Sequence, residues 1–318
     1  DLTAEFGTNT LRLNVWYENN DFEQARRFYD MGTSQTVPLT SALTYQSNPF
    51  FTQWNNDYNT RTFQSAVQDQ WEVTEDFTVT AGFKGQSVKL RAEAINPVPG
   101  PLALGRIKAE DLFLPQVGLL YKLGGGNELF ASFTQNQRAF TAAATTGPFA
   151  TSAAGFGVIS SQLRPEKTNT FEGGFRFGEG KVNGVIAAYL VNFSNRLLSI
   201  PQGPGIVGNA SLLSNVGDVR SLGVEIGLQW QPVKAFTVTA SYAYNENTYR
   251  DDVRNAAGAV VQAIRGKTVV DSPRSIANLE LAYDDGAFYG RANANAMSGR
   301  FFTFSNDREV SGRVVVDG

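Results

Sequence analysis

The chain has 318 residues, of which 42% are hydrophobic and 18% are charged, a balance that fits a large folded unit and argues against disorder. The formal net charge of -3 gives no reason to expect nucleic acid as a partner. Cysteine and histidine are both absent, which excludes disulfides, thiolate metal sites and every Ser-His or Cys-His nucleophile pair. We therefore expect no catalytic, metal-binding or cofactor-binding residues in this chain, and no enzyme.

Alternation of apolar and polar residues with period 2 is the dominant pattern, and it predicts strands with two different faces. It is clearest in Leu11 to Glu18, Phe77 to Lys84, Leu222 to Trp230 and Phe236 to Tyr244. Asp21 to Tyr29 has some helical character, but its neighbours favour a strand. The test predicts 13 strands, at about 8–18, 21–30, 60–73, 77–91, 112–123, 128–138, 168–177, 182–194, 221–231, 235–247, 273–283, 287–298 and 310–317.

Short and long connections alternate in strict order along the chain. The short ones are rich in turn residues and lie at Asn19-Asn20, 74–76, 124–127, 178–181, 231–234 and 284–286. The long ones cover about 31–59, 92–111, 139–167, 195–220, 248–272 and 299–309. A membrane barrel has this pattern, because its periplasmic turns are tight and its extracellular loops are long.

Aromatic residues near the ends of strands support the same interpretation. They occur beside the predicted short turns, where an interfacial girdle is expected, at Trp16, Tyr17, Trp71, Phe77, Tyr121, Phe130, Phe175, Phe177, Trp230, Phe236, Tyr283, Phe288 and Tyr289. The longest apolar run, Gly184 to Val191, has the length of a strand and is far from the roughly 20 residues of a membrane helix. We predict an all-β fold, a transmembrane antiparallel up-and-down β-barrel.

Several segments, in consistent order, resemble the barrel of TonB-dependent outer-membrane receptors. The most specific is Leu163 to Gly174 (LRPEKTNTFEGG), which is similar to an "L-K-P-E-x-S/T-x-x-Y/F-E-x-G" element of that family. Asn215 to Glu225 and Phe236 to Tyr244 resemble the strands "N-x-G-x-x-x-x-x-G-x-E" and "L-T-x-x-A-S-Y-x-Y". Further resemblances are the hairpin formed by 69–74 and 77–82 and the loop exit formed by Gly266-Lys267 and 272–274.

The resemblance implies a barrel of about 22 strands that is too wide for side chains to fill and that holds a plug. We expect residues 1–318 to be a barrel domain truncated at both ends, because the strand near Val314 is only beginning and 13 strands leave an unpaired edge. The plug domain and the segment that contacts TonB are expected upstream of Asp1. On the inward faces we expect the charged residues Arg12, Lys84, Glu172, Arg176, Glu225 and Glu280.

Three long connections are the candidate ligand surface. The segment 48–58 carries Phe50, Phe51, Trp54 and Tyr58, which suit sugars or aromatic siderophores, although packing onto the barrel rim is the preferred interpretation. The Gly-, Ala- and Thr-rich segment 140–156 is expected to be mobile and carries Phe140, Phe149 and Phe156. Arg250, Arg254 and Arg265 are suited to an anionic iron chelate, with lipopolysaccharide phosphates or solvent as the alternative.

The resemblance implies a receptor in the outer membrane of a Gram-negative bacterium that imports a scarce nutrient, of the siderophore-iron, cobalamin or carbohydrate class. Its expected partners are outer-membrane lipid and lipopolysaccharide, the small-molecule nutrient, and TonB through the upstream plug region. The main alternative is a passive porin-like channel, and a soluble all-β binding module and an outer-membrane enzyme are the remaining classes. Haem import is disfavoured because the sequence contains no histidine for axial ligation.

Overall fold

The structure is a computed structural model that describes residues 1–29, 49, 51–95, 100–144, 147–161, 163–201, 211–215, 217–254 and 259–318. Its main element is a 13-stranded sheet. The strands of that sheet are β1 (Leu2–Phe6), β2 (Asn9–Phe28), β3 (Phe51–Glu72), β4 (Phe77–Ala94), β5 (Gly105–Gly124), β6 (Asn127–Arg138), β7 (Glu166–Glu179), β8 (Val182–Ser194), β11 (Val219–Val233), β12 (Phe236–Tyr249), β15 (Ser275–Asp284), β16 (Tyr289–Met297) and β19 (Arg313–Asp317).

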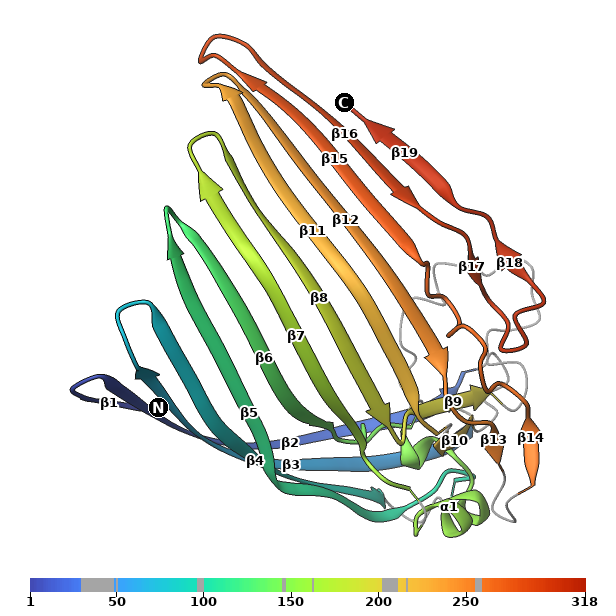
Figure 1. Ribbon diagram of the computed structural model, residues 1–318. Coiled ribbons are helices and arrows are strands. Elements are labelled where there is room, and N and C mark those ends of the chain that lie inside the picture. Colours follow the sequence, from blue (N-terminus) through green and yellow to red (C-terminus); the bar gives the residue numbers. More distant parts are fainter. Residues whose placement is uncertain are drawn as a thin grey trace.

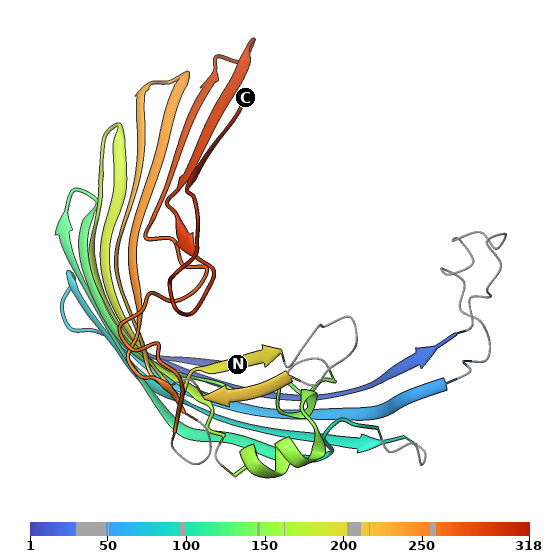
Figure 2. The same ribbon diagram turned by 90° about the vertical axis from the view of Figure 1, so that its right-hand side faces the viewer.

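Each strand of this sheet pairs in antiparallel fashion with the next one along the chain, so the sheet is an up-and-down meander. The strands run side by side from β1 at one edge to β19 at the other (Figure 1). Figure 2 shows that the sheet curves strongly, as a wall of a barrel does. The predicted all-β, antiparallel up-and-down fold is therefore confirmed.

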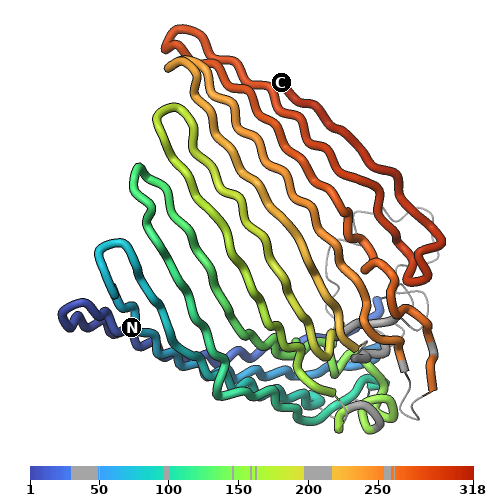
Figure 3. The backbone as a smooth tube through the Cα atoms, in the orientation of Figure 1, coloured from blue at the N-terminus to red at the C-terminus, as the bar shows by residue number. Residues whose placement is uncertain are grey.

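The tight turns all lie at one end of the strands, and the described parts of the long connections lie at the other end (Figure 3). The first tight turn is Gly7-Thr8, between β1 and β2. Gly7 and Gly180, in the tight turn between β7 and β8, have φ angles of 60° and 59°. These positive φ values are readily adopted by glycine and suit the twist of two-residue hairpin turns.

The predicted turn at Asn19-Asn20 is wrong, because both residues lie in the middle of the continuous strand β2. Turn-forming residues are tolerated there because their side chains find partners across the sheet. The Asn59 side chain on β3 donates to Asn19 Oδ1 over 2.8 Å and also to the Asp21 carboxylate. The two short predicted strands 8–18 and 21–30 thus form one strand, and β1, which was not predicted, brings the total back to 13.

The register divides the side chains of the sheet into two chemically different faces. One, the apolar face, carries large exposed hydrophobic residues in cross-strand rows such as Ile186, Ile226 and Tyr242. The other, the polar face, carries Arg12, Lys84, Glu172, Arg176, Glu225 and Glu280 at register positions on the same side. A large exposed apolar surface opposite a polar one is typical of a sheet between lipid and an aqueous lumen.

The predicted aromatic residues mostly flank the tight turns of the sheet. Trp71, Tyr121, Trp230 and Tyr283 lie on the apolar face near those turns and are between 43% and 47% exposed. Trp16 and Tyr17 differ from the prediction, because both lie inside β2, far from the turn at Gly7-Thr8. Of these two, only Tyr17 belongs to the apolar face, where it is opposite Phe63 of β3.

The strands differ greatly in length from one edge of the sheet to the other. Strands β2 to β5 have 20, 22, 18 and 20 residues, whereas β15 and β16 have 10 and 9. A tilted transmembrane strand needs about 9–11 residues. The long strands therefore extend well past a bilayer on the side of the long connections.

The only helical elements that the structure describes are short. They are the 3-10 helix η2 (Pro148–Ala150) and the helix α1 (Ala153–Ile159), both in the connection between β6 and β7. Over the described residues, none of the helices is long and apolar enough to span a membrane.

The two faces predict opposite responses to an inserted charge. Ile226→Arg places a cation in the middle of the apolar face, where contact with lipid is expected to cost about 2–4 kcal/mol of folding free energy. Gln229→Arg places the same cation on the polar face of the same strand and is expected to change stability by less than about 1 kcal/mol. Urea unfolding of the full-length protein in lipid vesicles measures both values, and equal losses would contradict the assignment of the faces.

Candidate functional site

The long connections form small secondary elements of their own at one edge of the sheet. Strands β9 (Leu197–Pro201) and β10 (Ser211–Asn215) pair with each other, as do β13 (Val253–Arg254) with β14 (Val260–Gln262) and β17 (Arg300–Phe301) with β18 (Glu309–Val310). The elements β9, β10, β13, β14 and α1 lie on the side of the long connections, and β17 and β18 lie at the ends of β16 and β19 (Figure 1). This edge is where most of the predicted ligand-binding residues lie.

A cluster of buried hydrophobic side chains forms where the connection between β6 and β7 packs against the extended parts of β3, β4 and β5. We call it the rim core. Its buried members are Trp54, Tyr58, Val88, Leu90, Ala92, Leu102, Ala109, Phe140, Ala142, Ala144, Phe149 and Leu163, and Phe156 is half-buried against them. Five of the predicted ligand residues therefore meet in one place, and four of them are buried.

Trp54 and Tyr58 lie in β3 and not in the predicted loop, because the strand begins at Phe51. Tyr58 is fully buried, stacks on Phe22 with ring centroids 5.3 Å apart and lies 6.3 Å from the ring of Phe149. Most of the described residues of 140–150 are buried, whereas Thr141 is exposed. The small alanine side chains of this segment allow the backbone to approach the sheet closely.

Polar contacts fix this connection to distant strands. The backbone N–H of Ala144 donates to the Gln24 side chain on β2 over 3.0 Å. The backbone N–H of Ala103 donates to the carbonyl of Thr151 over 2.8 Å. Ser152 caps α1 by accepting a hydrogen bond from the N–H of Gly155. The segment therefore crosses the polar face from β6 and β7 back toward β2.

A second buried cluster holds the connections that follow β12 and β16. Val219, Tyr249, Val253 and Ile264 are its buried members, with Phe193, Val269 and Phe304 packed against them. The Asp252 carboxylate accepts hydrogen bonds from the N–H groups of Ile264 and Arg265, both over 2.9 Å. Asn306 bonds the backbone of Thr268 in both directions, over 2.7 and 2.9 Å. These loops are therefore joined to one another as well as to the sheet.

Asp307 organises the tip of the connection between β17 and β18. Its carboxylate accepts hydrogen bonds from the hydroxyls of Ser305 and Thr303, each over 2.6 Å. These two bonds lower the pKa of Asp307 below its ordinary value. The carboxylate thus stays ionised to lower pH than an ordinary aspartate, and this turn is expected to keep its two hydrogen bonds until the pH falls below the usual aspartate range.

The other predicted ligand residues differ in accessibility. Phe51 is 52% exposed and its ring lies 5.7 Å from that of Phe28, at the end of β2 and β3. Arg250 and Arg265 are exposed, and Arg254 lies in β13. Phe50 lies outside the described residues. Sequence reasoning missed Phe28, because it lies in a segment that was predicted only as the end of a strand.

Side chains on the polar face pair across neighbouring strands. Gln116 donates to Gln68 over 2.9 Å, Arg176 lies 2.5 Å from Glu128, and Arg291 forms an ion pair with Glu280. These pairs satisfy polar groups that a lipid environment would penalise. The polar face is thus a hydrophilic wall whose members are already linked to one another.

A polar hollow of about 260 Å³ interrupts this wall at the height of the bulge between β4 and β5. Asn14, Gln64, Lys84, Gln86 and Gln137 are among the residues that line it. Lys84 donates to Asn136, whereas both side-chain polar atoms of Gln137 are buried without a hydrogen-bond partner. A buried amide of this kind favours contact with another polar group.

The family model for the β-barrel of TonB-dependent receptor-like proteins matches residues 1–318, the whole of the chain. The protein belongs to the TonB-dependent receptor family. The resemblance inferred from the sequence is thereby confirmed, and barrels of this family are outer-membrane proteins.

Known relatives agree with this assignment. An uncharacterised TonB-dependent receptor of Haemophilus influenzae is 27% identical over 237 residues, which cover 74% of this chain and 62% of the relative. The siderophore receptor PiuA of Acinetobacter baumannii has a similar fold, with a TM-score of 0.70, 16% identity, and coverage of 99% of this chain and 47% of PiuA. The copper transporter OprC gives a TM-score of 0.71 at 16% identity, covering 99% and 46%. The TonB-dependent receptor barrel described here thus spans 46% to 62% of the length of these relatives.

The rim core predicts which aromatic side chains hold the connection between β6 and β7 in place. Tyr58→Ala removes a fully buried ring from beneath Phe149 and is expected to destabilise this region by about 3 kcal/mol. Phe51→Ala removes an exposed ring from the same strand and is expected to cost less than about 1 kcal/mol. Hydrogen exchange of the backbone amides of 147–161 in the full-length receptor should accelerate in the first variant only. Equal exchange in both would show that Tyr58 does not hold the segment.

Proposed function

We propose that this barrel belongs to an outer-membrane receptor of a Gram-negative bacterium that actively imports a scarce nutrient, energised through TonB. The observation that carries the proposal is the match of all 318 residues to the barrel model of the family. The polar face gives it a physical basis, since a charged inner wall suits a water-filled or plugged lumen. No enzymatic activity is proposed.

The polar face is the proposed contact surface for a plug. We infer that residues 1–318 form a barrel domain that is truncated at both ends, with the plug encoded upstream. The hollow lined by Lys84 and Gln137 offers buried hydrogen-bonding groups to such a plug. Through that upstream region the receptor would contact TonB, and nutrient release would follow movement of the plug.

The exposed candidates at the long connections form the proposed ligand surface. Phe51 offers an aromatic face, and Arg250 and Arg265 offer positive charge to an anionic iron chelate. Phe50 and Arg254 stay candidates on sequence grounds. The buried Trp54, Tyr58, Phe140 and Phe149, with Phe156, are proposed to set the position of the surface from below.

The proposed substrate class is siderophore-bound iron, with cobalamin and carbohydrate as the other nutrient classes. Similar folds include a siderophore receptor, PiuA, and a copper transporter, OprC. The alternative function is a passive porin-like channel. It is favoured only by the polar and charged side chains of the polar face, which a simple pore would share.

Energy coupling separates these two functions. Cells that carry the full-length receptor are expected to take up one labelled nutrient among ferric siderophores, cobalamin and oligosaccharides, and to lose that uptake to background when TonB is inactivated. An imported nutrient moves against its gradient only when a plug is driven. Uptake that continues unchanged without TonB would instead establish the passive channel. A small solute that enters through general porins provides the control.

The two exposed arginines predict a charge effect on binding. The double variant Arg250→Gln with Arg265→Gln is expected to weaken binding of an anionic ferric chelate about fivefold to tenfold at low salt, and less at high salt. Lys122→Gln with Lys234→Gln removes two charges at the opposite edge of the sheet and serves as the matched control. Titration of the full-length receptor with the chelate measures both. Unchanged affinity in the first variant would remove these arginines from the ligand surface.

A further inference from the structure

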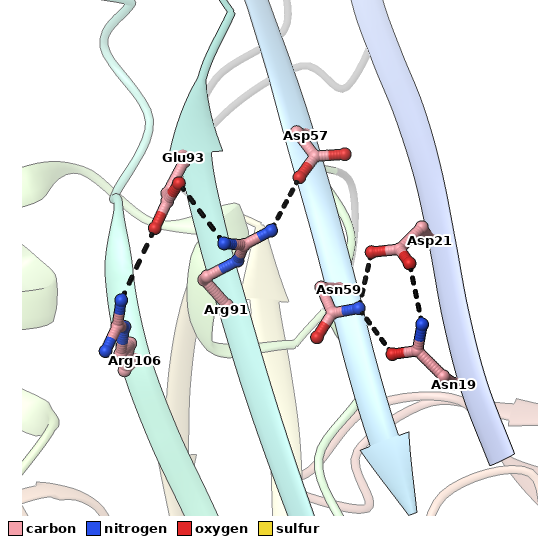
Figure 4. A network of polar contacts seen from close by, with 7 residues as sticks. All are labelled: Asn19, Asp21, Asp57, Asn59, Arg91, Glu93 and Arg106. Atoms are coloured by element: carbon pink, nitrogen blue, oxygen red, sulfur yellow. Dashed lines mark hydrogen bonds and ion pairs between the residues drawn. The ribbon is translucent and has the colours of Figure 1, made fainter.

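Positively charged side chains line up across three neighbouring strands on the side of the sheet that also carries the apolar face. Arg61 of β3 is directly opposite Lys89 of β4, which is directly opposite Lys108 of β5. In the next row outward, Arg91 of β4 is opposite Arg106 of β5. We call these five residues the cation rows. Figure 4 shows both arginines of the second row with the polar side chains beside them.

Cross-strand neighbours of like charge repel one another and destabilise a sheet. Carboxylates offset part of this repulsion at the borders of the rows. Arg91 lies 3.2 Å from Asp57 and 3.5 Å from Glu93, Arg106 lies 3.7 Å from Glu93, and Lys108 lies 2.6 Å from Glu110. Within the described part of the chain, neither Arg61 nor Lys89 forms an ion pair with any carboxylate.

The cation rows surround a groove of about 380 Å³, lined by Asn59, Arg61, Lys89, Leu90, Arg91, Arg106, Ile107 and Lys108. Among the residues that the structure describes, only three of the five cations pair with carboxylates, and those carboxylates number three, so the groove carries an excess of positive charge. Four of the five cations have exposed side chains, namely Arg61, Lys89, Arg106 and Lys108. The groove is therefore large enough and positive enough for a small multivalent anion.

The position of the groove relative to the apolar face indicates the kind of anion. Phe63 and Tyr17 are opposite each other on the apolar face, 44% and 64% exposed, and Arg61 follows Phe63 two positions farther out. Trp71, at the other end of the same face of β3, is eight residues from Phe63, or about 26 Å along the strand, which a tilted strand needs to cross most of a transmembrane apolar band. The cation rows thus begin where the apolar band ends, on the side of the long connections.

We propose that the cation rows bind the phosphate groups of a phosphorylated glycolipid in the outer leaflet of the membrane. Its acyl chains would lie against the apolar face below, beside Tyr17, Phe63 and Phe83, while its phosphates enter the groove. The phosphates supply the negative charge that Arg61 and Lys89 lack among the described residues, and they add to the single carboxylate that Lys108 contacts. A nutrient anion is a poor occupant, because the rows project from the side opposite to the polar face.

This site goes beyond the import function and does not depend on which nutrient is carried. The test uses the full-length receptor in detergent, with purified bisphosphorylated lipid A as the probe and native mass spectrometry as the readout. The variant Arg61→Gln, Lys89→Gln, Lys108→Gln is expected to bind the probe at least tenfold more weakly, since each cation near an anionic lipid contributes appreciably. Lys122→Gln, Lys181→Gln, Lys234→Gln removes three charges near the tight turns and is expected to bind as the unmodified receptor does.

Two further probes distinguish the source of the anion. The unmodified receptor is expected to bind lipid A weakly when both phosphates have been removed from the lipid. Its affinity is expected to match that of the Arg61→Gln, Lys89→Gln, Lys108→Gln variant for intact lipid A. Inorganic phosphate alone is expected not to displace bound lipid A at equal concentration. Equal binding by the two triple variants, retention of the dephosphorylated lipid, or displacement by free phosphate would each overturn the proposal.

Cells that carry the Arg61→Gln, Lys89→Gln, Lys108→Gln variant are expected to keep their nutrient uptake, because the cation rows lie on the side of the sheet opposite to the polar face. Loss of uptake together with normal lipid A binding would overturn the separation of the two sites. A change in gel migration between unheated and heated samples of the variant identifies a barrel that has assembled. A second variant, Lys89→Gln alone, provides a milder change that is expected to weaken lipid A binding severalfold.

Discussion

The absence of water inside a bilayer is the constraint on which the rest of this structure depends. Every backbone N–H and C=O that crosses the membrane has to be bonded within the protein, and a meander of antiparallel strands does this with local connections. Once the backbone is satisfied in that way, side chains alternate between the two sides of the sheet. The apolar face, the polar face and the division between tight turns and long connections all follow from that single arrangement.

The same alternation explains why so much of the fold was predictable from the sequence. Strands β4, β8, β11 and β12 were placed to within a few residues, because each keeps a regular apolar row over its membrane-crossing part. The prediction failed where strands extend past the membrane. At Asn19 and Asn20 the apolar row stops and polar side chains bond across the sheet, so that local turn chemistry outweighs the strand pattern in the sequence. The start of β3 was missed for the same reason, because Phe51 to Tyr58 has no alternation against lipid.

The candidate site was less predictable, because its aromatic residues occur in separate segments whose meeting depends on tertiary packing. Trp54 and Tyr58 were identified as conspicuous side chains, but nothing local indicates that Phe140 and Phe149 cover them. The cation rows illustrate the same limit. Arg61, Lys89 and Lys108 are far apart in the sequence and unremarkable singly, and only the register of three strands makes them direct neighbours. A sequence shows which residue types are present. Which of them lie next to one another depends on how the strands pair and how the connections pack.

Because the strands differ in length, they extend to different heights on the side of the long connections. On the flank built from β2 to β5 the wall stands high above the membrane, whereas it ends close to the surface at β15 and β16. Large bodies that approach a cell from outside, such as antibodies or bacteriophages, would meet the tall flank first. Small solutes that diffuse along the membrane surface would meet a lower wall at β15 and β16. The difference in strand length therefore sets how far each part of this wall extends beyond the membrane.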